Sequence, residues 1–395
     1  MKKCKQGFVA GFANEKEGSA FLAKETVGIF GKTVSADMVE VYKTQFTSTN
    51  HSYLLLTYSR AGHILKEDKH MGKFSSRKLT ACIAIFTLVL ASCAISMAET
   101  ATVEVTDIYG TVTVPVNPQN VVALDNRTFE TLADWGIALA AAPKGVMPAD
   151  SVYVSDDSVQ DIGTHNDPNL EIIAAVNPEL VIVGQRFAGR YEEIKALVPN
   201  AAVINLNFDV SVEADAPGDN LVNGLKNSTL ALGQIFNKNE EAAQLTADFD
   251  AAIEKVKAAY NGTDTVISVV VSGGNIGFSA PRSGRVWGPM HEIFGWVSAL
   301  NVDGASSDHQ GDDISVEAIA QSNPDWLFVL DRDAATSSAG NSSPAQDVIN
   351  HSPALQNTTA VTQGQIVYAP SDTYTNESIQ TYVELFEDLA NALAE

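Results

Sequence analysis

Two arginines stand at matched places in a repeated stretch of the sequence. Residues 168–183 read PNLEIIAAVNPELVIV and residues 314–330 read ISVEAIAQSNPDWLFVL, and in each copy an arginine, Arg186 or Arg332, follows the shared proline by eight residues. A guanidinium is permanently charged and offers a planar fork of N–H donors that fits carboxylates, phosphates and similar oxygen-rich groups. The pair therefore points to the binding of an anion with many oxygens.

Positive charge is scarce in the part of the chain that carries this repeat. The whole chain has a formal net charge of −23, and after residue 92 it has 12 Lys and Arg against 41 Asp and Glu, a balance of −29. Such a surface repels nucleic acid, anionic lipid headgroups and anionic ligands alike. An anion would bind only where the few arginines are gathered. A pair of surface salt bridges is the alternative role for Arg186 and Arg332.

Three other arginines are candidates for the same site. Arg285, in SAPRSGRVWGPM, follows a strand predicted at 266–271, and Arg282 in the same loop is its alternative. Arg127 follows VVALD, and it lies either beside the other arginines or in the first turn of a helix, facing water. Three arginines that each contribute ~1.5–3 kcal/mol through charge-assisted hydrogen bonds would supply most of the about 8 kcal/mol of a micromolar affinity.

The segments that must position these arginines alternate between short apolar strands and helices. After a hairpin around residues 109–110, strands are predicted at NVVALD, ELVIVG, AAVINLN, TVISVVVSGG, DWLFVLD and QIVYAP, and a closing helix begins at Glu377. This alternation favours parallel sheets that are covered on both faces, in which ligands bind beyond the carboxyl ends of the strands. The candidate arginines follow strands of this kind.

A helix-forming stretch separates two such regions. Residues 220–260 are almost free of helix breakers, and a helix at 238–260 would be roughly 30 Å long, about the width of a small domain. We predict an α/β fold with two Rossmann-like lobes, 93–237 and 261–395, joined by a single long interlobe helix. The two copies of the repeat would then bring their arginines to one cleft.

Residues 71–92 have the features of a signal peptide, with a basic start, a central apolar run and small residues after it. The run of about 13 residues is shorter than the ~20 of a spanning helix. Cleavage after Ala98 would release a soluble protein, whereas Leu-Ala-Ser-Cys resembles a lipoprotein box with lipidation at Cys93, and we favour the lipoprotein. Residues 1–70 precede this start and are expected to be absent from the real product, with a cytoplasmic extension as the alternative.

Histidine and glycine patterns argue against common metal and enzyme sites. Four histidines follow residue 92, namely His165, His291, His309 and His351, and none has HxH or HxxxH spacing. No G-x-G-x-x-G, Walker or G-x-S-x-G motif occurs, so neither a dinucleotide site nor a hydrolase nucleophile is indicated. His309, in SSDHQGDD, and Tyr374, in APSDTYTNES, lie in polar loops. Each is a candidate ligand contact, with an ordinary loop residue as the alternative.

On these residues the chain resembles the substrate-binding proteins of ABC importers, specifically the binders of ferric siderophores of the catecholate type. The resemblance covers roughly residues 103–395. It rests on VVALDNRTFETLADWGI, the doubled E-x-I-A-x-x-N-P, VGQR, DHQGDDIS and VLDRD, and on the order in which they occur. It implies two α/β lobes around a ligand site and no catalytic activity.

The resemblance also implies roles for single residues. In that family three arginines grip the anionic complex, and the matching residues are Arg186, Arg285 and Arg332, with Arg127 as a further candidate. The loop of Arg285 carries about one extra residue relative to the family pattern, which leaves Arg282 open.

Two further pairs of residues match the family pattern. In some members a histidine and a tyrosine complete the iron coordination of four-coordinate siderophores, and the matching residues are His309 and Tyr374. One surface glutamate on each lobe docks to arginines of the permease, and these resemble Glu171 and Glu317, which stand seven residues before the two repeated prolines.

We therefore expect an exported, lipid-anchored, monomeric binding protein that captures an iron(III)–siderophore complex and delivers it to a permease and its ATPase. It would have no intrinsic cofactor. Haem, ferric citrate and cobalamin are the alternative ligands, since each presents carboxylates or phosphate. A metal-ion receptor using His165 and His309, or an exported hydrolase, would be the alternative from another class.

Overall fold

The computed structural model describes residues 101–211, 213–302, 310–336 and 343–395. The predicted signal peptide, Cys93 and the upstream residues 1–70 lie outside these ranges, and so does His309. No helix within the described ranges is long and apolar enough to cross a membrane. The following account concerns the described residues alone.

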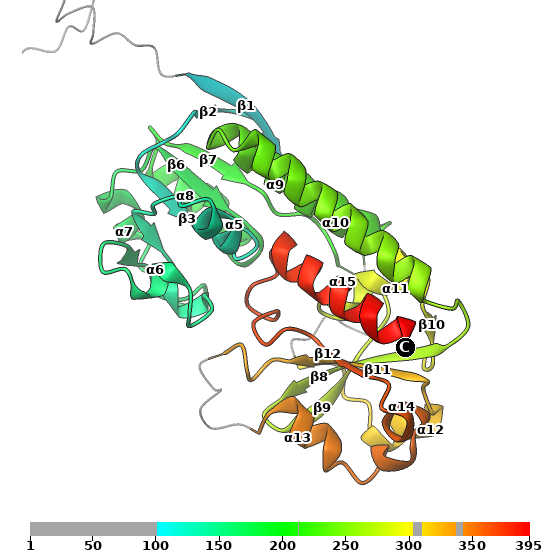
Figure 1. The fold of residues 1–395 in the computed structure, drawn as a ribbon. Coiled ribbons are helices and arrows are strands. Elements are labelled where there is room, and N and C mark those ends of the chain that lie inside the picture. Colours follow the sequence, from blue (N-terminus) through cyan, green and yellow to red (C-terminus); the bar gives the residue numbers. More distant parts are fainter. Residues whose placement is uncertain (1–100, 212, 303–309, 337–342) are drawn as a thin grey trace, which may run out of the picture. The chain divides into compact units, whose positions relative to one another are not determined.

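Residues 121–205 form a first lobe, in which β3, β6 and β7 are labelled in Figure 1. Its parallel sheet has the strand order β5-β4-β3-β6-β7. Its three middle strands are buried along their whole length, as expected for a sheet covered on both faces. Its elements are β3 (Val121–Ala123), α5 (Phe129–Asp134), β4 (Ala141–Ala142), η1 (Lys144–Val146), α6 (Val152–Ser155), β5 (Gln160–Asp161), α7 (Glu171–Ala175), β6 (Leu180–Val183), η2 (Gln185–Arg190), α8 (Tyr191–Leu197) and β7 (Ala202–Asn205).

A second lobe has a sheet with the order β10-β8-β11-β12, whose strands are parallel, and β9 pairs antiparallel with β8. The long strands β8 and β11 are almost entirely buried. Its elements are β8 (Thr265–Ser272), β9 (Asn275–Ser279), α11 (Trp287–Phe294), β10 (Val297–Ser298), α12 (Val316–Ser322), β11 (Trp326–Asp331), α13 (Ala345–Asn350), η4 (Leu355–Asn357), α14 (Thr359–Gln363) and β12 (Ile366–Tyr368).

An antiparallel hairpin precedes the first lobe, as predicted. Strands β1 (Thr102–Asp107) and β2 (Gly110–Pro115) pair in register from Thr102 with Pro115 to Asp107 with Gly110. The Asp107 carboxylate closes the turn by accepting the backbone N–H of Tyr109 at 2.7 Å, and its other oxygen accepts the N–H of Asn205 at 2.8 Å. The hairpin is thereby fixed to the end of β7.

The repeated sequence folds into the same unit in both lobes. Helix α7 leads into β6, which pairs with β3, and α12 leads into β11, which pairs with β8. An asparagine with positive φ stands at the end of each helix: Asn177, at 47°, follows the C-cap of α7, and Asn323, at 44°, is the C-cap of α12. Proline comes next in both copies. Asparagine tolerates the left-handed conformation that stops a helix, and proline cannot continue one. The shared Asn-Pro is therefore a helix terminator before a buried strand.

The helix-forming stretch between the lobes contains two helices where the sequence predicted one. Helix α10 (Asn239–Ala259) matches the predicted 238–260 helix, but α9 (Pro217–Ile235) precedes it and packs against it in the antiparallel direction. The break is at Asn237, whose φ is 54°, and the N–H of Lys238 donates to the carbonyl of Gly233 at 2.7 Å. This left-handed asparagine and its 6→1 hydrogen bond form a Schellman stop. Helix α10 thus coincides with the predicted interlobe helix, and α9 pairs with it.

Helices α9 and α15 (Ile379–Ala394) connect the hydrophobic cores. The first half of α9 contributes Leu221 and Leu225 to the core of the second lobe, and its end contributes Leu232 and Ile235 to that of the first. Helix α15 packs along α10, while Gln380 in its first turn accepts a hydrogen bond from the α5 hydroxyl of Thr131 at 2.8 Å. The lobes are therefore joined by packing and by polar contacts near the start of α15.

A buried histidine in α11 should make the stability of the protein depend on pH. His291 is 7% exposed and lies edge-on to Trp296, and burial lowers its pKa from the ordinary value of 6.5 to about 4. Since the unfolded chain binds this proton more readily, the contribution of neutral His291 is complete above about pH 6.5 and is lost as pH falls towards 4. The loss amounts to about 2–3 kcal/mol between pH 7 and 4.5.

His291→Phe should therefore flatten the pH dependence of the free energy of unfolding over this interval. Urea denaturation of the parent and the variant at both pH values measures the difference. His351→Phe is the matched control, because His351 is exposed. If His291→Phe and the parent lose the same stability on acidification, the neutral buried imidazole is not responsible.

Candidate functional site

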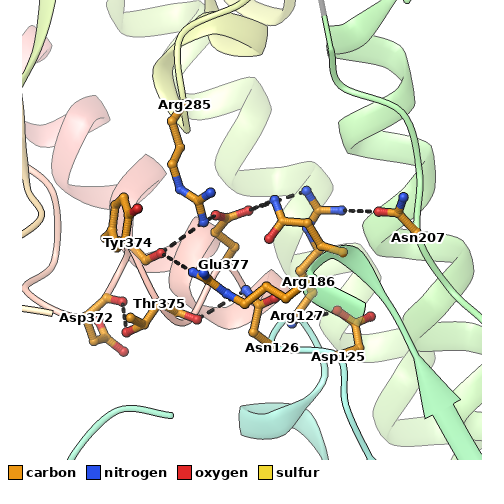
Figure 2. Close-up of polar contacts among 11 residues, drawn as sticks. Asp125, Asn126, Arg127, Arg186, Asn207, Arg285, Asp372, Tyr374, Thr375 and Glu377 are labelled. Carbon is orange, nitrogen blue, oxygen red and sulfur yellow. Dashed lines mark hydrogen bonds and ion pairs between the residues drawn. The ribbon is translucent and has the colours of Figure 1, made fainter. Parts of the chain in front are cut away.

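The candidate site is built from residues that follow the carboxyl ends of strands (Figure 2). Two of its arginines come from the first lobe and two from the second. Tyr374 and Glu377 lie beyond β12, in the loop that leads to α15. We call the four arginines the arginine cluster, which comprises Arg127 after β3, Arg186 in η2 after β6, Arg285 between β9 and α11, and Arg332 directly after β11.

Tyr374 is the point on which three of these arginines converge. The guanidinium carbons of Arg186, Arg285 and Arg332 lie 5.9, 4.5 and 5.3 Å from the centre of its ring, within the range of a cation–π interaction. Its backbone carbonyl accepts a hydrogen bond from Arg186 at 3.2 Å and from Arg285 at 3.1 Å. Tyr374 as a residue is 5% exposed, and cations from both lobes lie around its ring.

Glu377 is a buried carboxylate in the middle of the cluster. Its Oε2 accepts hydrogen bonds from Arg127 at 3.4 Å and from Gln185 at 3.3 Å, and its Oε1 pairs with Arg285. Burial alone would raise the pKa of this carboxyl, but Arg285, Arg127 and Arg186 together outweigh burial and lower it. Glu377 is therefore an ionised counter-charge, 3% exposed, inside the site.

Arg127 is the most enclosed of the four arginines. It is 5% exposed, its guanidinium stacks 3.9 Å from the ring centre of Phe208, and it donates to Asn207 at 3.4 Å as well as to Glu377. The sequence left two positions open for Arg127, one beside the other arginines and one in the first turn of a helix, facing water. The structure shows the first of these.

Arg332 is held within its own lobe. Its Nη1 donates to the hydroxyl of Ser272, at the end of the neighbouring strand β8, at 3.1 Å. The carboxylate of Asp333 lies 4.0 Å away and accepts the N–H of Gly273 at 2.6 Å. Arg332 thus lies beside the Tyr374 ring. Its guanidinium makes one hydrogen bond, to Ser272, and one long ion pair, with Asp333.

The loop between β9 and α11 distinguishes Arg285 from Arg282. Arg285 points to Tyr374 and Glu377, whereas Arg282 donates to the carbonyls of Ala214 at 2.8 Å and Asp215 at 3.3 Å. The loop is strained, since Arg282 has φ 70° and the β-branched Val286 has φ 64°. The neighbouring Gly284 is also required, because a Cβ there would lie 2.2 Å from the hydroxyl of Ser279. The backbone of this loop therefore fixes where Arg285 points.

The glycine of VGQR has a specific packing role. A Cβ on Gly184 would lie 1.9 Å from the carboxyl carbon of Asp125, so only glycine lets the end of β6 approach the end of β3. Burial raises the pKa of Asp125, although the neighbouring Arg127 acts in the opposite direction. Gly184 thereby allows Gln185 and Arg186 to enter the site beside Arg127.

The two predicted docking glutamates are exposed and lie outside the cluster. Glu171 and Glu317 each stand in the first turn of a helix, α7 or α12. A helix that precedes a parallel strand runs antiparallel to it, so both glutamates lie at the carboxyl edges of their sheets. The structure thus gives them matched surface positions on the two lobes.

The remaining sequence candidates do not join this site. His165 is partly exposed in the loop before α7, and His351 is exposed after α13. Within the described ranges, no group of three or more His, Cys, Asp or Glu side chains is placed to hold a metal ion. His309 belongs to the part that is not described.

Sequence reasoning missed Glu377, Gln185 and Asn126 as members of the site. Glu377 was predicted to begin the closing helix, but Ser378 caps that helix by accepting the N–H of Thr381 at 3.1 Å. Glu377 is left in the preceding loop and turns inward. Asn126 donates to the carbonyl of Thr375 at 3.2 Å and ties this loop to β3. The sequence did contain a signal for this helix start, because serine is a preferred N-cap residue and glutamate is not. Ser378 is therefore a better N-cap than Glu377.

Comparison with known proteins identifies the family to which this architecture belongs. A family model described as periplasmic binding protein matches residues 121–373, which is most of the described chain. The chain belongs to the periplasmic binding protein family. Membership makes it a ligand-binding protein rather than an enzyme, and the predicted two-lobed α/β fold is confirmed.

Individual relatives cover most of the chain. The petrobactin-binding protein YclQ of Bacillus subtilis is 27% identical over 285 residues, which are 71% of this chain and 84% of that protein. The ferric-anguibactin-binding protein FatB of Vibrio anguillarum is 29% identical over 276 residues, 69% of this chain and 81% of that protein.

Solved structures agree with this fold. The crystal structure of YclQ aligns with a TM-score of 0.62 at 25% identity and covers 75% of this chain and 99% of that one. The siderophore-binding protein BauB, bound to a complex of two acinetobactin molecules and ferric iron, aligns with a TM-score of 0.63 at 25% identity, over 75% of this chain and the whole of that one.

Proposed function

We propose that this protein captures an anionic iron(III)–siderophore complex of the catecholate type and delivers it to the permease of an ABC importer. The observation that carries the proposal is the convergence of guanidiniums from both lobes on Tyr374. A ferric catecholate is a compact polyanion with oxygens on its surface, which is the chemistry that a group of arginine forks recognises. The names of YclQ, FatB and BauB, which refer to siderophores, support this ligand class.

Arg186, Arg285 and Arg332 are the residues to which we assign ligand contacts. All three residues are partly exposed. Arg186 and Arg285 each donate a hydrogen bond to the carbonyl of Tyr374, and Arg332 donates one to the hydroxyl of Ser272. An oxygen-rich ligand would replace these acceptors or bind beside them. Each charge-assisted contact would contribute ~1.5–3 kcal/mol. Arg127 is enclosed, and we assign it to the support of the site through Glu377.

Tyr374 would complete the coordination of iron in a ligand that leaves positions open. Phenolic oxygen is an established ligand of iron(III) in proteins. Tyr374 lies at the centre of the cluster, so a complex held by the arginines would bring iron close to its ring. His309 is proposed as the second such ligand on the sequence resemblance alone, because it lies outside the described residues. Iron is cargo in this scheme, and no resident cofactor is proposed.

We further propose that the chain is exported and that lipidation of Cys93 anchors it, as a monomer, to the outer face of the cytoplasmic membrane. The sequence features at 71–93 support this proposal. Membrane fractionation of cells that express Cys93→Ala tests it. The variant should leave the membrane fraction, and an unchanged distribution would exclude the anchor.

Titration with a panel of ferric complexes tests the proposed ligand class. Tryptophan fluorescence should be quenched by a ferric tris-catecholate and a ferric bis-catecholate with dissociation constants of about 1 μM or lower, which corresponds to about 8 kcal/mol. Trp287, two residues from Arg285 and fully buried, is one reporter. Ferric citrate, haem, cobalamin and a neutral ferric trihydroxamate should bind at least tenfold more weakly. If one of these binds most tightly, the ligand class is wrong.

A further inference from the structure

Glu377 occupies the position that an anionic ligand would be expected to take. Three donors from both lobes, on Arg127, Gln185 and Arg285, contact its two carboxylate oxygens. It is 3% exposed, yet its charge is retained, because the surrounding arginines lower the pKa of its carboxyl. A negative charge thus lies beside the guanidiniums of Arg127 and Arg285, one from each lobe (Figure 2).

This carboxylate divides the arginine cluster into two pairs. Arg127 and Arg285 form ion pairs with Glu377, whereas Arg186 contacts the carbonyl of Tyr374, and the carboxylate of Asp333 lies 4.0 Å from Arg332. Interactions between charges are weakly screened in a buried site. The positive charge available to a ligand is therefore smaller than the number of arginines suggests.

We propose that Glu377 is a specificity-determining counter-charge, which sets the preference of the site among ferric complexes of different net charge. The inference rests on the proposed function and adds to it. Glu377 lowers the affinity for the most highly charged anions and hardly affects neutral complexes. In exchange, it stabilises the buried guanidinium of Arg127 when the site is empty, because an unpaired buried charge is costly.

A purely structural role for Glu377 predicts a different result. If the carboxylate only held Arg285 in place, its loss would disorder that side chain and weaken binding of every anionic complex. If it acts as a counter-charge, its removal would strengthen binding in proportion to the charge of the ligand. Affinity measured against ligand charge therefore separates the two roles.

Glu377→Gln keeps the shape and removes the charge. We expect its affinity for a trianionic ferric tris-catecholate to rise about tenfold and its affinity for a neutral ferric trihydroxamate to change less than twofold. Glu377→Asp, which keeps the charge, should show no such gain. Asp250→Asn removes one charge from the exposed pair with Lys226 on α9 and α10, and it should change neither affinity. The proposal would be overturned if the ratio of tris-catecholate affinity to trihydroxamate affinity were the same in Glu377→Gln as in the parent, or smaller.

A second variant covers the case in which Glu377→Gln does not fold. Arg127→Gln with Glu377→Gln removes both members of the buried ion pair and restores the net charge of the site. Its affinity for the tris-catecholate should lie within about threefold of the parent, while Arg127→Gln alone should bind about tenfold more weakly. The proposal is contradicted if the double variant binds the tris-catecholate no more tightly than Arg127→Gln alone.

The parent protein distinguishes failure of this inference from failure of the proposed function. If the parent does not bind ferric catecholates at all, the proposed ligand class is wrong. If the parent binds them and the variants do not follow site charge, the ligand class stands and Glu377 is a structural residue.

Discussion

Replacing Arg186 or Arg332 with alanine is expected to weaken binding of a ferric tris-catecholate by ~1.5–3 kcal/mol, which is roughly ten- to over a hundredfold. Each substitution removes a charge-assisted donor from the partly enclosed surroundings of Tyr374. The overall negative charge of the chain does not prevent binding, because at physiological salt repulsion beyond about 8 Å is largely screened. Short-range pairing with the arginines then decides affinity. Fluorescence titration of the purified variants measures the effect.

Three controls separate this effect from general damage. Lysine at either position should recover only part of the affinity, since it keeps the charge and loses the planar fork. A neutral ferric trihydroxamate should respond much less to each change. Arg190→Ala is the matched arginine control, because Arg190 lies four residues from Arg186 and forms an exposed pair with Glu193. If alanine at both positions leaves catecholate affinity within twofold of the parent, the proposed site is wrong.

The second large effect is expected on transport. Glu171→Ala combined with Glu317→Ala should abolish uptake of the iron–siderophore complex by cells while leaving the affinity of the purified protein unchanged. The reason is positional, because both residues are exposed in the first turns of α7 and α12, at matched edges of the two lobes and outside the arginine cluster. A symmetric pair of carboxylates is suited to contact a two-subunit permease through paired cations.

Radiolabelled iron uptake and ligand titration are the two measurements for this pair. Glu192→Ala with Glu240→Ala, two exposed glutamates on α8 and α10, is the control and should leave uptake near that of the parent. A fall in ligand affinity together with uptake would mean that Glu171 and Glu317 act at the binding site.

Local sequence patterns predicted most of the fold. The strands around the site are short apolar runs, and the Asn-Pro terminators fixed where two helices end, so β6, β11 and the arginines after them could be placed correctly. The start of α10 was predicted at residue 238, but α9 was not predicted as a separate helix, because residues 220–237 have much the same helix-forming composition as the residues that follow. A left-handed residue is identified by its backbone, and composition alone does not reveal it.

The site was predicted in part, for a similar reason. The positions after strands indicated Arg186 and Arg332, but Arg282 and Arg285 differ only in the path of a strained loop that no local pattern encodes. Glu377 was missed because its inward orientation depends on the helix cap at Ser378 and on donors from a distant lobe. Contacts between residues far apart in the chain decide which acidic residue becomes a buried counter-charge.

The most direct measurement of the central claim is the position of iron in crystals of the complex with a ferric bis-catecholate, located by anomalous scattering. The account predicts an iron peak beside the hydroxyl of Tyr374, with catecholate oxygens about 3 Å from donors of Arg186, Arg285 and Arg332. An iron peak elsewhere, with the contacts of these arginines to Tyr374 and Glu377 unchanged, would contradict it.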